Sequence, residues 1–338
     1  MGGDRAPEVV VKGANIARDR YPNVRFLLIG DEVRLARLLR RKRRLRSRTT
    51  IHHTTEAVSN DARPSAALRT GRKSSMWLAI QAVRDGKAQG VVSAGNTGAL
   101  MAMAKLMLRT LPGIDRPAIA SFIPTLRGES VVLDLGANVE CNANNLVQFA
   151  VMGAIFARTV QGFDRPTVGL LNVGSEDMKG HEELKVAAGI LRGGEFPFQF
   201  HGFVEGDDIT GGTVDVVVTD GFSGNIALKT AEGTARLVGQ FLREAFKSSL
   251  SARLGYVFAR RALKKLRLRV DPRSYNGAMF VGLNGIAVKS HGGTDAFGFA
   301  NAIGVAVDMA LGGFNDRIKD ELARLTPVRA LEPQAASL

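Results

Sequence analysis

The sequence contains little cysteine, few aromatic residues and no long apolar run. Its single cysteine, Cys141, excludes an intrachain disulfide and fits a reducing compartment. Aromatic residues make up 6% of the chain, which leaves few rings to stack on nucleic-acid bases. No apolar run reaches the roughly 18 residues of a membrane span, and the N-terminus has no signal-peptide pattern. We therefore expect a soluble chain, or one bound at most to a membrane surface.

Several catalytic motifs are also missing. No Gly-x-Gly-x-x-Gly with a downstream ribose-binding acid is present, which disfavours a dehydrogenase. No Gly-x-Ser-x-Gly elbow is present, so a Ser–His–Asp relay is not expected. No trio of carboxylates has metal-ligand spacing. The sequence thus predicts neither a metal nor a cofactor.

Positive charge is abundant. The chain has 46 Lys and Arg against 32 Asp and Glu, a net charge of +14. This excess favours an acidic partner, which could be nucleic acid, anionic lipid, a phosphorylated substrate or an acidic carrier protein. The sequence contains no nucleic-acid recognition motif, so no specific nucleic acid is expected. With 38 glycines and 45% apolar residues, the composition is typical of a turn-rich α/β enzyme.

The charge is concentrated in two segments. Residues 34–48 carry nine basic residues, no acidic one, and an apolar helical stripe that includes Leu35 and Leu39. They form either a solvated helix face or a contact for an acidic partner. Residues 241–269 carry nine basic residues against Glu244, with apolar residues at helical spacing. We expect an amphipathic helical protrusion within residues 232–270, which contacts an anionic membrane or helical partner, or else a second subunit or the core.

Glycine-rich turns follow several apolar strands. Residues 216–229 contain a run of three valines, then glycines, and then a helix-forming segment, and residues 91–100 repeat this pattern. Such a loop directs unpaired N–H groups and the positive end of a helix dipole at one point, which suits a phosphate or carboxylate. Ordinary packing turns between strand and helix are the alternative. The polar and glycine residues of the two loops are Gly95, Asn96, Thr97, Gly98, Asp220, Ser223, Gly224, Asn225 and Lys229.

Three further strand ends carry polar residues. Asp134 and Asn138 follow one strand, Lys179 follows the next, and Lys289 and His291 follow a late one. About six strand–turn–helix units predict a parallel sheet with helices on both faces, an α/β/α arrangement. In such a sheet all these turns would share one edge, which would be the active site. Cys141 has no neighbouring base and is interpreted as a packing residue.

Taken together, the motifs at residues 93–100, 133–141, 171–180, 202–208, 219–229 and 289–292 resemble the bacterial phosphate acyltransferase family, PlsX. The resemblance implies a three-layer α/β/α fold of the isocitrate-dehydrogenase and phosphotransacetylase type. The resemblance further implies a homodimer. The length of 338 residues fits one catalytic unit over residues 1–338, built either as a single large domain or as two interleaved lobes. The family also has a strand before the turn formed by residues 1–4, where this sequence begins. Ser175, Gly293 and Thr294 depart mildly from the family pattern.

The resemblance implies that the substrates are acyl-[acyl carrier protein] and inorganic phosphate. The product would be acyl phosphate, which a membrane glycerol-3-phosphate acyltransferase uses in phospholipid synthesis. Phosphotransacetylase activity on short-chain acyl-CoA is the alternative. Phosphate dianion and a thiolate leaving group need little acid–base help, so binding and oxyanion stabilisation are the demanding tasks. We therefore expect direct attack of phosphate on the thioester.

The catalytic candidates are Lys179, Lys229, Lys289, His291 and Asn225. The candidates for binding phosphate or substrate are Gly95, Asn96, Thr97, Gly98, Asp134, Asn138, Asp220, Ser223 and Gly224. Among the second group, Asp134, Asn138 and Asp220 are expected to orient the others and not to react.

Overall fold

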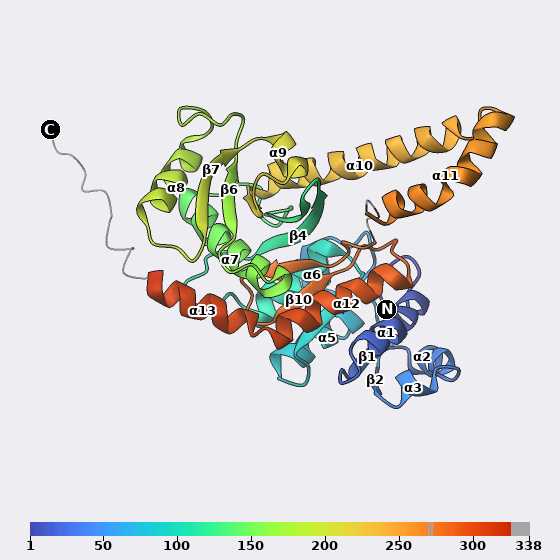
Figure 1. Ribbon diagram of the computed structural model, residues 1–338. Helices are drawn as coiled ribbons and strands as arrows, with labels where there is room; N and C mark the ends of the chain where they lie inside the picture. The colour runs from blue at the N-terminus through green and yellow to red at the C-terminus, as the bar shows by residue number, and fades with distance from the viewer. Residues whose placement is uncertain (270, 272, 326–338) are drawn as a thin grey trace.

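The computed structural model describes residues 1–325 except 270 and 272 (Figure 1). Its strands are β1 Phe26–Gly30, β2 Thr49–His53, β3 Gly90–Ser93, β4 Ala118–Thr125, β5 Gly128–Leu133, β6 Thr167–Leu171, β7 Gln199–Val204, β8 Val216–Val218, β9 Ala278–Val281 and β10 Ile286–Lys289. Its helices are α1 Glu8–Arg20, α2 Glu32–Leu39, α3 Arg43–Arg46, α4 Pro64–Thr70, α5 Ser75–Arg84, α6 Thr97–Leu108, α7 Ala143–Gln161, α8 Glu182–Gly193, α9 Gly206–Gly211, α10 Gly221–Ala245, α11 Leu250–Arg269, α12 Ala296–Leu311 and α13 Phe314–Leu325.

Eight strands form the main sheet, in the order β3-β10-β9-β4-β5-β8-β6-β7. Four neighbouring pairs are parallel, namely β3–β10, β5–β8, β8–β6 and β6–β7. The three central pairs, β10–β9, β9–β4 and β4–β5, are antiparallel. Strands β3 and β10 therefore run opposite to β5, β8, β6 and β7. The expectation that all glycine-rich turns share one side of the sheet is wrong. The carboxyl ends of β3 and β10 point one way along the strands, and those of β5, β8, β6 and β7 point the other way.

Helices cover both faces of this sheet. On one face, buried residues of α7, α8, α12 and α13 pack against the strands around Phe149 and Phe156. On the other face, α4, α5, α6 and α9 pack around Leu100 and Met103, and the start of α10 joins them through Leu228. Both faces of the sheet can be covered because valine-rich strands such as β8 carry apolar side chains on both sides. The predicted three-layer α/β/α architecture is confirmed.

A small separate unit lies beside the sheet. Strands β1 and β2 pair in parallel with each other and form a two-stranded sheet. Helices α1, α2 and α3 surround them, and α1 packs against α12 in a third buried cluster that includes Val11, Leu39 and Phe299. Residues near the N-terminus and residues near position 300 are thus neighbours (Figure 1).

Helices α10 and α11 form the protruding pair (Figure 1). Helix α10 runs without a break from Gly221 to Ala245, so one helix connects a glycine-rich loop to the protrusion. The rings of Phe246 and Tyr256 make an edge-to-face contact, with centroids 5.6 Å apart, and this contact joins the two helices. Residue 270, the last position of the expected protrusion, lies outside the described residues. Among the described helices no single one is long and apolar enough to cross a membrane, although α12 and α13, which are bent by 52° at their junction, meet those criteria as a pair.

Candidate functional site

The loop after β5 is organised by a buried carboxylate. Asp134 has no exposed surface and accepts hydrogen bonds from the backbone N–H groups of Ile119, Gly136, Ala137 and Asn138, at 2.7–3.2 Å. The Asn138 side chain donates a further bond at 2.9 Å. Burial raises the pKa of Asp134, although these bonds oppose the shift. Asp134 and Asn138 therefore hold the loop in place, and their expected role in orienting the reacting groups stays a prediction.

The start of α10 is fixed in the same region. Asp220 is the N-cap and accepts bonds from the N–H of Ser223 at 2.8 Å and from its hydroxyl at 2.9 Å. Gly224 is buried, whereas Asn225 is exposed and donates its side-chain amide to the carbonyl of Leu135 at 3.2 Å. The loops after β5 and β8 are thereby tied together. The helix N-terminus presents its dipole at this junction.

The loop after β3 lies at the opposite end of the strands from the loops after β5 and β8. Asn96 caps α6 by accepting from the N–H of Ala99 at 2.8 Å, and its amide donates to the carbonyls of Asn60 and Ala62 at 2.7 and 2.9 Å. Its side chain is thus already engaged in positioning the loop. Gly95 donates its N–H to the Ser93 hydroxyl at 3.2 Å.

Close contacts surround that loop. An added Cβ at Gly95 would lie 2.7 Å from the terminal carbon of Met76, and one at Gly98 would lie 2.8 Å from a ring carbon of Pro64. The N-terminal segment also contributes, because a Cβ at Gly2 would lie 2.6 Å from Cα of Gly95. Thr97, the first residue of α6, is exposed.

Lys289 and His291 follow β10. Lys289 is half-buried, and its ammonium donates to the carbonyl of Ser290. The N–H of His291 donates to the side-chain oxygen of Asn276 at 2.8 Å, and its Nδ1 accepts from the N–H of Gly293 at 3.1 Å. The imidazole of His291 therefore stabilises the loop to which it belongs, and its Nε2 is directed away from the hydrogen bond to Gly293.

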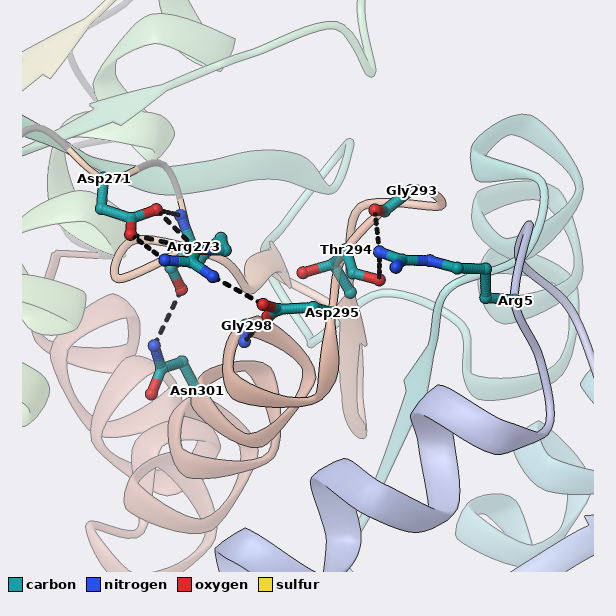
Figure 2. A network of polar contacts seen from close by, with 8 residues as sticks. All are labelled: Arg5, Asp271, Arg273, Gly293, Thr294, Asp295, Gly298 and Asn301. Carbon is teal, nitrogen blue, oxygen red and sulfur yellow. Dashed lines mark hydrogen bonds and ion pairs between the residues drawn. The ribbon is translucent and has the colours of Figure 1, made fainter.

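A network of hydrogen bonds and ion pairs holds this loop from both sides (Figure 2). Arg5 donates to the carbonyls of Gly293 and Thr294, each at 2.9 Å. Arg273 bridges Asp271 and the α12 N-cap residue Asp295, and the two carboxylates raise the pKa of its guanidinium. The Lys289 loop is consequently fixed both to the N-terminal segment and to the start of α12.

The two groups of loops meet at Lys289. Burial lowers the pKa of Lys289 to about 8; the negative charge of Asp4 opposes this shift, and the positive charge of Lys229 adds to it. Lys229 is close enough to influence this pKa because α10 extends from the far group of loops. Lys289, which pairs in register with Ser93, thus lies beside the glycine-rich loop after β3, and the charge of Lys229 from the other group of loops acts on it.

Asp4 was not predicted from the sequence. Its N–H donates to the carbonyl of Gly292 at 3.1 Å, and its carboxylate accepts from the side chain of Asn60 at 3.2 Å. The signal for it was the pair of glycines immediately before it, which is the pattern seen at the end of a strand. Asp4 places a negative charge beside Lys289.

Lys179 has different surroundings. Its ammonium pairs with Glu176 at 2.8 Å, and this carboxylate, with the charge of Glu205, raises the pKa of Lys179. The structure gives it no contact with Lys229 or Lys289. Lys229 itself is exposed and pairs with Glu232 at 2.9 Å. Of these three lysines, Lys289 is the half-buried one.

Cys141 lies near Asp134 and Asp220. Burial, with the charges of these two carboxylates, raises the pKa of the thiol to about 12. A thiol with this pKa is protonated at neutral pH and is a poor nucleophile. The interpretation of Cys141 as a packing residue agrees with these surroundings.

Two surface hollows lie away from these loops. The larger, of about 520 Å³, is beside the β4–β5 hairpin, and the other, of about 350 Å³, lies between α7 and α13. None of the predicted site residues lines either hollow. The candidate site is therefore defined by its loops and charges.

Known proteins place the chain in a family. Residues 1–317 match the family model described as "Fatty acid synthesis protein". A phosphate acyltransferase of Paramagnetospirillum magneticum is 63% identical over 337 residues, spanning 100% of this chain and 96% of that protein. One from Rhodospirillum centenum is 66% identical over 337 residues, spanning 100% of this chain and 94% of that protein.

Solved structures show the same fold. A phosphotransacetylase from Streptococcus pyogenes has a TM-score of 0.60 at 18% identity, covering 90% of this chain and 92% of its own. A branched-chain phosphotransacylase from Enterococcus faecalis has a TM-score of 0.55 at 13% identity, covering 91% and 96%. The phosphotransacetylase-like fold expected from the sequence is confirmed. On the sequence relationships, the chain belongs to the phosphate acyltransferase (PlsX) family of fatty acid synthesis proteins.

Proposed function

We propose that this phosphate acyltransferase moves a long-chain fatty acyl group from acyl-[acyl carrier protein] to inorganic phosphate. The product, acyl phosphate, would then enter phosphatidic acid synthesis. The observation that carries the proposal is the half-buried Lys289, which pairs in register with Ser93 before the loop after β3 and is influenced by the charge of Lys229 on α10. Such a site suits two anionic reactants and needs no metal.

The proposed reaction is a direct displacement. A phosphate oxygen attacks the thioester carbonyl carbon, and the electron pair of the C=O bond moves to oxygen. When the oxyanion collapses, the C–S bond breaks and the thiolate leaves, to be protonated by water. Because the phosphate dianion is abundant at neutral pH and a thiol is a good leaving group, no strong general base is required.

The residues divide these tasks by position. The positive end of the α10 dipole, near Ser223 and Gly224, attracts phosphate, and Lys229 adds positive charge about one and a half helical turns further on. Lys289 stabilises the oxyanion from its half-buried position. Asp134 and Asp220 keep the loops in place through their hydrogen bonds.

Mass spectrometry tests the reaction. Purified protein is incubated with phosphate and palmitoyl-carrier protein, palmitoyl-CoA or acetyl-CoA, and acyl phosphate is detected directly. Acyl phosphate from the carrier-protein substrate alone supports the proposal. Activity with acetyl-CoA alone would assign a short-chain phosphotransacetylase instead, and silence with all three substrates from folded protein would refute both.

Exchange of the carrier tests direct attack. Labelled free carrier is mixed with unlabelled acyl-carrier protein in the presence or absence of phosphate. An acyl-enzyme would allow label to enter the acyl-carrier pool without phosphate, whereas direct attack requires phosphate for that exchange. Label incorporation without phosphate, or a trapped acyl group on Cys141 or Ser223, would contradict the scheme.

We further propose that the α10–α11 pair docks on the anionic inner face of the plasma membrane, from the cytoplasm. Its exposed apolar side chains include Phe241, Leu254 and Phe258, interspersed with basic residues. Docking there would deliver labile acyl phosphate to the membrane glycerol-3-phosphate acyltransferase. Flotation with anionic liposomes tests this, and unchanged binding by a Leu254→Glu, Phe258→Glu variant would refute it.

We also propose that the protein forms a homodimer through the α10–α11 pair. A second copy would cover part of the apolar surface of the same helical pair, including Leu237 and Val238, which are about half exposed. Light scattering measures the mass in solution. A monomer at micromolar concentration would contradict the dimer, and loss of the dimer in the Leu254→Glu, Phe258→Glu variant would place the interface on the pair.

A further inference from the structure

The small β1–β2 unit carries a dense positive surface. Eight exposed arginines lie on or next to α2 and α3, and they are called here the arginine surface: Arg34, Arg37, Arg40, Arg41, Arg43, Arg44, Arg46 and Arg48. Arg34 lies 3.7 Å from Glu8. Among the described residues, none of the other seven lies within ion-pair distance of a carboxylate. The surface therefore keeps most of its charge available for a partner.

This surface is rigidly supported. Leu35, Leu39 and Leu45 are each no more than 2% exposed and anchor α2 and α3 to the buried cluster shared with α1 and α12. Asp31 caps α2 by accepting from the N–H of Arg34 at 2.9 Å. Because the helices are fixed, the arginines form a defined pattern of charge and not a flexible tail.

The arginine surface is close to the candidate site. The Met1 side chain packs at Gly30, next to the α2 N-cap, since a Cβ at Gly30 would lie 2.5 Å from its Cγ. Three residues later the N–H of Asp4 bonds to Gly292, beside Lys289. Three residue steps of extended chain cover at most about 11 Å. A partner held on α2 would thus be adjacent to the reacting groups.

The apolar content of the surface points to a protein partner. Val33, 77% exposed, is the large apolar residue that α2 leaves uncovered, whereas α11 exposes Leu250, Leu254 and Phe258. Membrane-binding helices combine basic residues with an exposed apolar face, and the arginine surface lacks such a face in the described structure. Arginine binds carboxylates through paired hydrogen bonds, which suits a folded acidic protein.

We propose that the arginine surface docks the acidic carrier protein that delivers the acyl thioester. This inference rests on the proposed function and adds the place where its carrier binds. The arginines attract the carboxylates of the carrier and orient it so that its thioester-bearing arm enters between the loops of Gly95 and Lys289. Docking there raises the local concentration of the thioester without contacting the acyl chain.

Charge reversal tests the surface. In an Arg37→Glu, Arg41→Glu variant, we expect the Kd for labelled carrier protein to rise about tenfold, and the KM for palmitoyl-carrier protein to rise with it, at low salt. The kcat stays close to that of the wild type, because neither arginine touches the reacting atoms. An Arg37→Lys, Arg41→Lys variant keeps the charge and restores most of the affinity, which a purely structural role would not require.

The control variant carries the same change of net charge at two positions outside the arginine surface. Lys87→Glu with Arg165→Glu alters two exposed residues away from α2 and α3, and its Kd should match the wild type. Equal Kd values for all variants, or equal losses in the control, would overturn the proposal. Loss of binding to phosphatidylglycerol vesicles with unchanged carrier binding would overturn it in favour of a membrane.

These experiments test carrier binding and the acyl transfer reaction separately, so either proposal can be refuted without the other. If the wild type binds carrier through these arginines but forms no acyl phosphate, the docking surface stands and the proposed reaction is refuted. If acyl phosphate forms and the reversal leaves Kd and KM unchanged, the reaction stands and the docking surface is refuted. Circular dichroism and thermal melts of every variant establish that each is folded.

Discussion

Gly224 lies directly against the backbone of Asp134. A Cβ at position 224 would stand 2.0 Å from the Asp134 carbonyl oxygen, a separation that requires the helix or the loop to move. The first turn of α10 is therefore packed onto the loop after β5 with no room for a side chain. Both elements belong to the group of loops proposed to bind phosphate.

Gly224→Ala should accordingly damage the site. We expect a loss of about 1–3 kcal/mol in the free energy of unfolding, from overpacking, and a rise in the KM for phosphate as the loops separate. Gly233→Ala is the matched control in the same helix, because an added Cβ there would meet nothing within 4 Å apart from the adjoining residues and the helix's own backbone. Urea unfolding and phosphate titration measure both effects, and equal behaviour of the two variants would contradict the packing argument.

Lys289 should give the enzyme an alkaline limit. Its pKa is lowered to about 8, so the ammonium is lost as pH rises through that value, and kcat/KM should fall above it. Lys289→Arg keeps the charge at high pH and should remove the fall, whereas Lys289→Met should be slow at every pH. A pH–rate profile from 6 to 10 that is identical in the wild type and Lys289→Met would exclude this role.

The same pKa predicts a change in stability. In the unfolded chain the lysine holds its proton up to its ordinary value of 10.5, while the folded chain releases it from about 8. Between these values the unfolded state binds more protons, so stability should rise with pH in the wild type relative to Lys289→Met. Urea unfolding of both proteins at pH 7.5 and 9.5 measures the difference, and parallel curves would contradict it.

Lys229 and Lys179 should respond differently to removal. Lys229→Met removes a positive charge proposed to attract phosphate, so it should slow the reaction at least about tenfold, as loss of one charge-assisted contact does. Burial lowers the pKa of Lys289 most, but the charge of Lys229 adds to that shift, so its removal should also move the alkaline limit upward. Lys179→Met breaks an exposed pair with Glu176 and should change kcat/KM less than about threefold. Steady-state kinetics of the two variants decides, and the reverse order would move Lys179 into the catalytic group.

Cys141→Ala should retain activity. The raised thiol pKa and the hydrogen-bonded surroundings leave no thiolate for attack at neutral pH. We expect kcat within about twofold of the wild type and stability lowered by no more than about 1 kcal/mol, as for a small packing change. Complete inactivation of a well-folded Cys141→Ala protein would reopen the covalent route.

The sequence was sufficient for the layers but not for the strand directions. Valine-rich runs ending in glycine predicted strands and turns, and these occur at β3, β5, β6 and β8. The antiparallel centre was missed, although a signal existed. Residues 126–127 join β4 to β5, and residues 282–285 join β9 to β10. Connections this short cannot cross over between parallel strands, so they require hairpins.

The site was partly predictable for a similar reason. Local pattern identified Asp220 and Asn96, because an N-cap acts within three residues of itself. It could not show that the charge of Lys229 acts on Lys289, since that depends on the length of α10 and the direction of two groups of strands. Nor could it assign Asp4, whose partners Gly292 and Asn60 are distant in sequence.

The contact between the N-terminal segment and the Lys289 loop also affects the order of events during synthesis. Arg5 bonds to residues 288 and 289 positions away, so this part of the site cannot close until almost the whole chain has been translated. At ordinary elongation rates that delay is roughly 15 to 60 seconds. During it, the apolar face of α1 lacks its partner α12, which has not yet been made, and a nascent chain at this stage is a natural client for ribosome-associated chaperones.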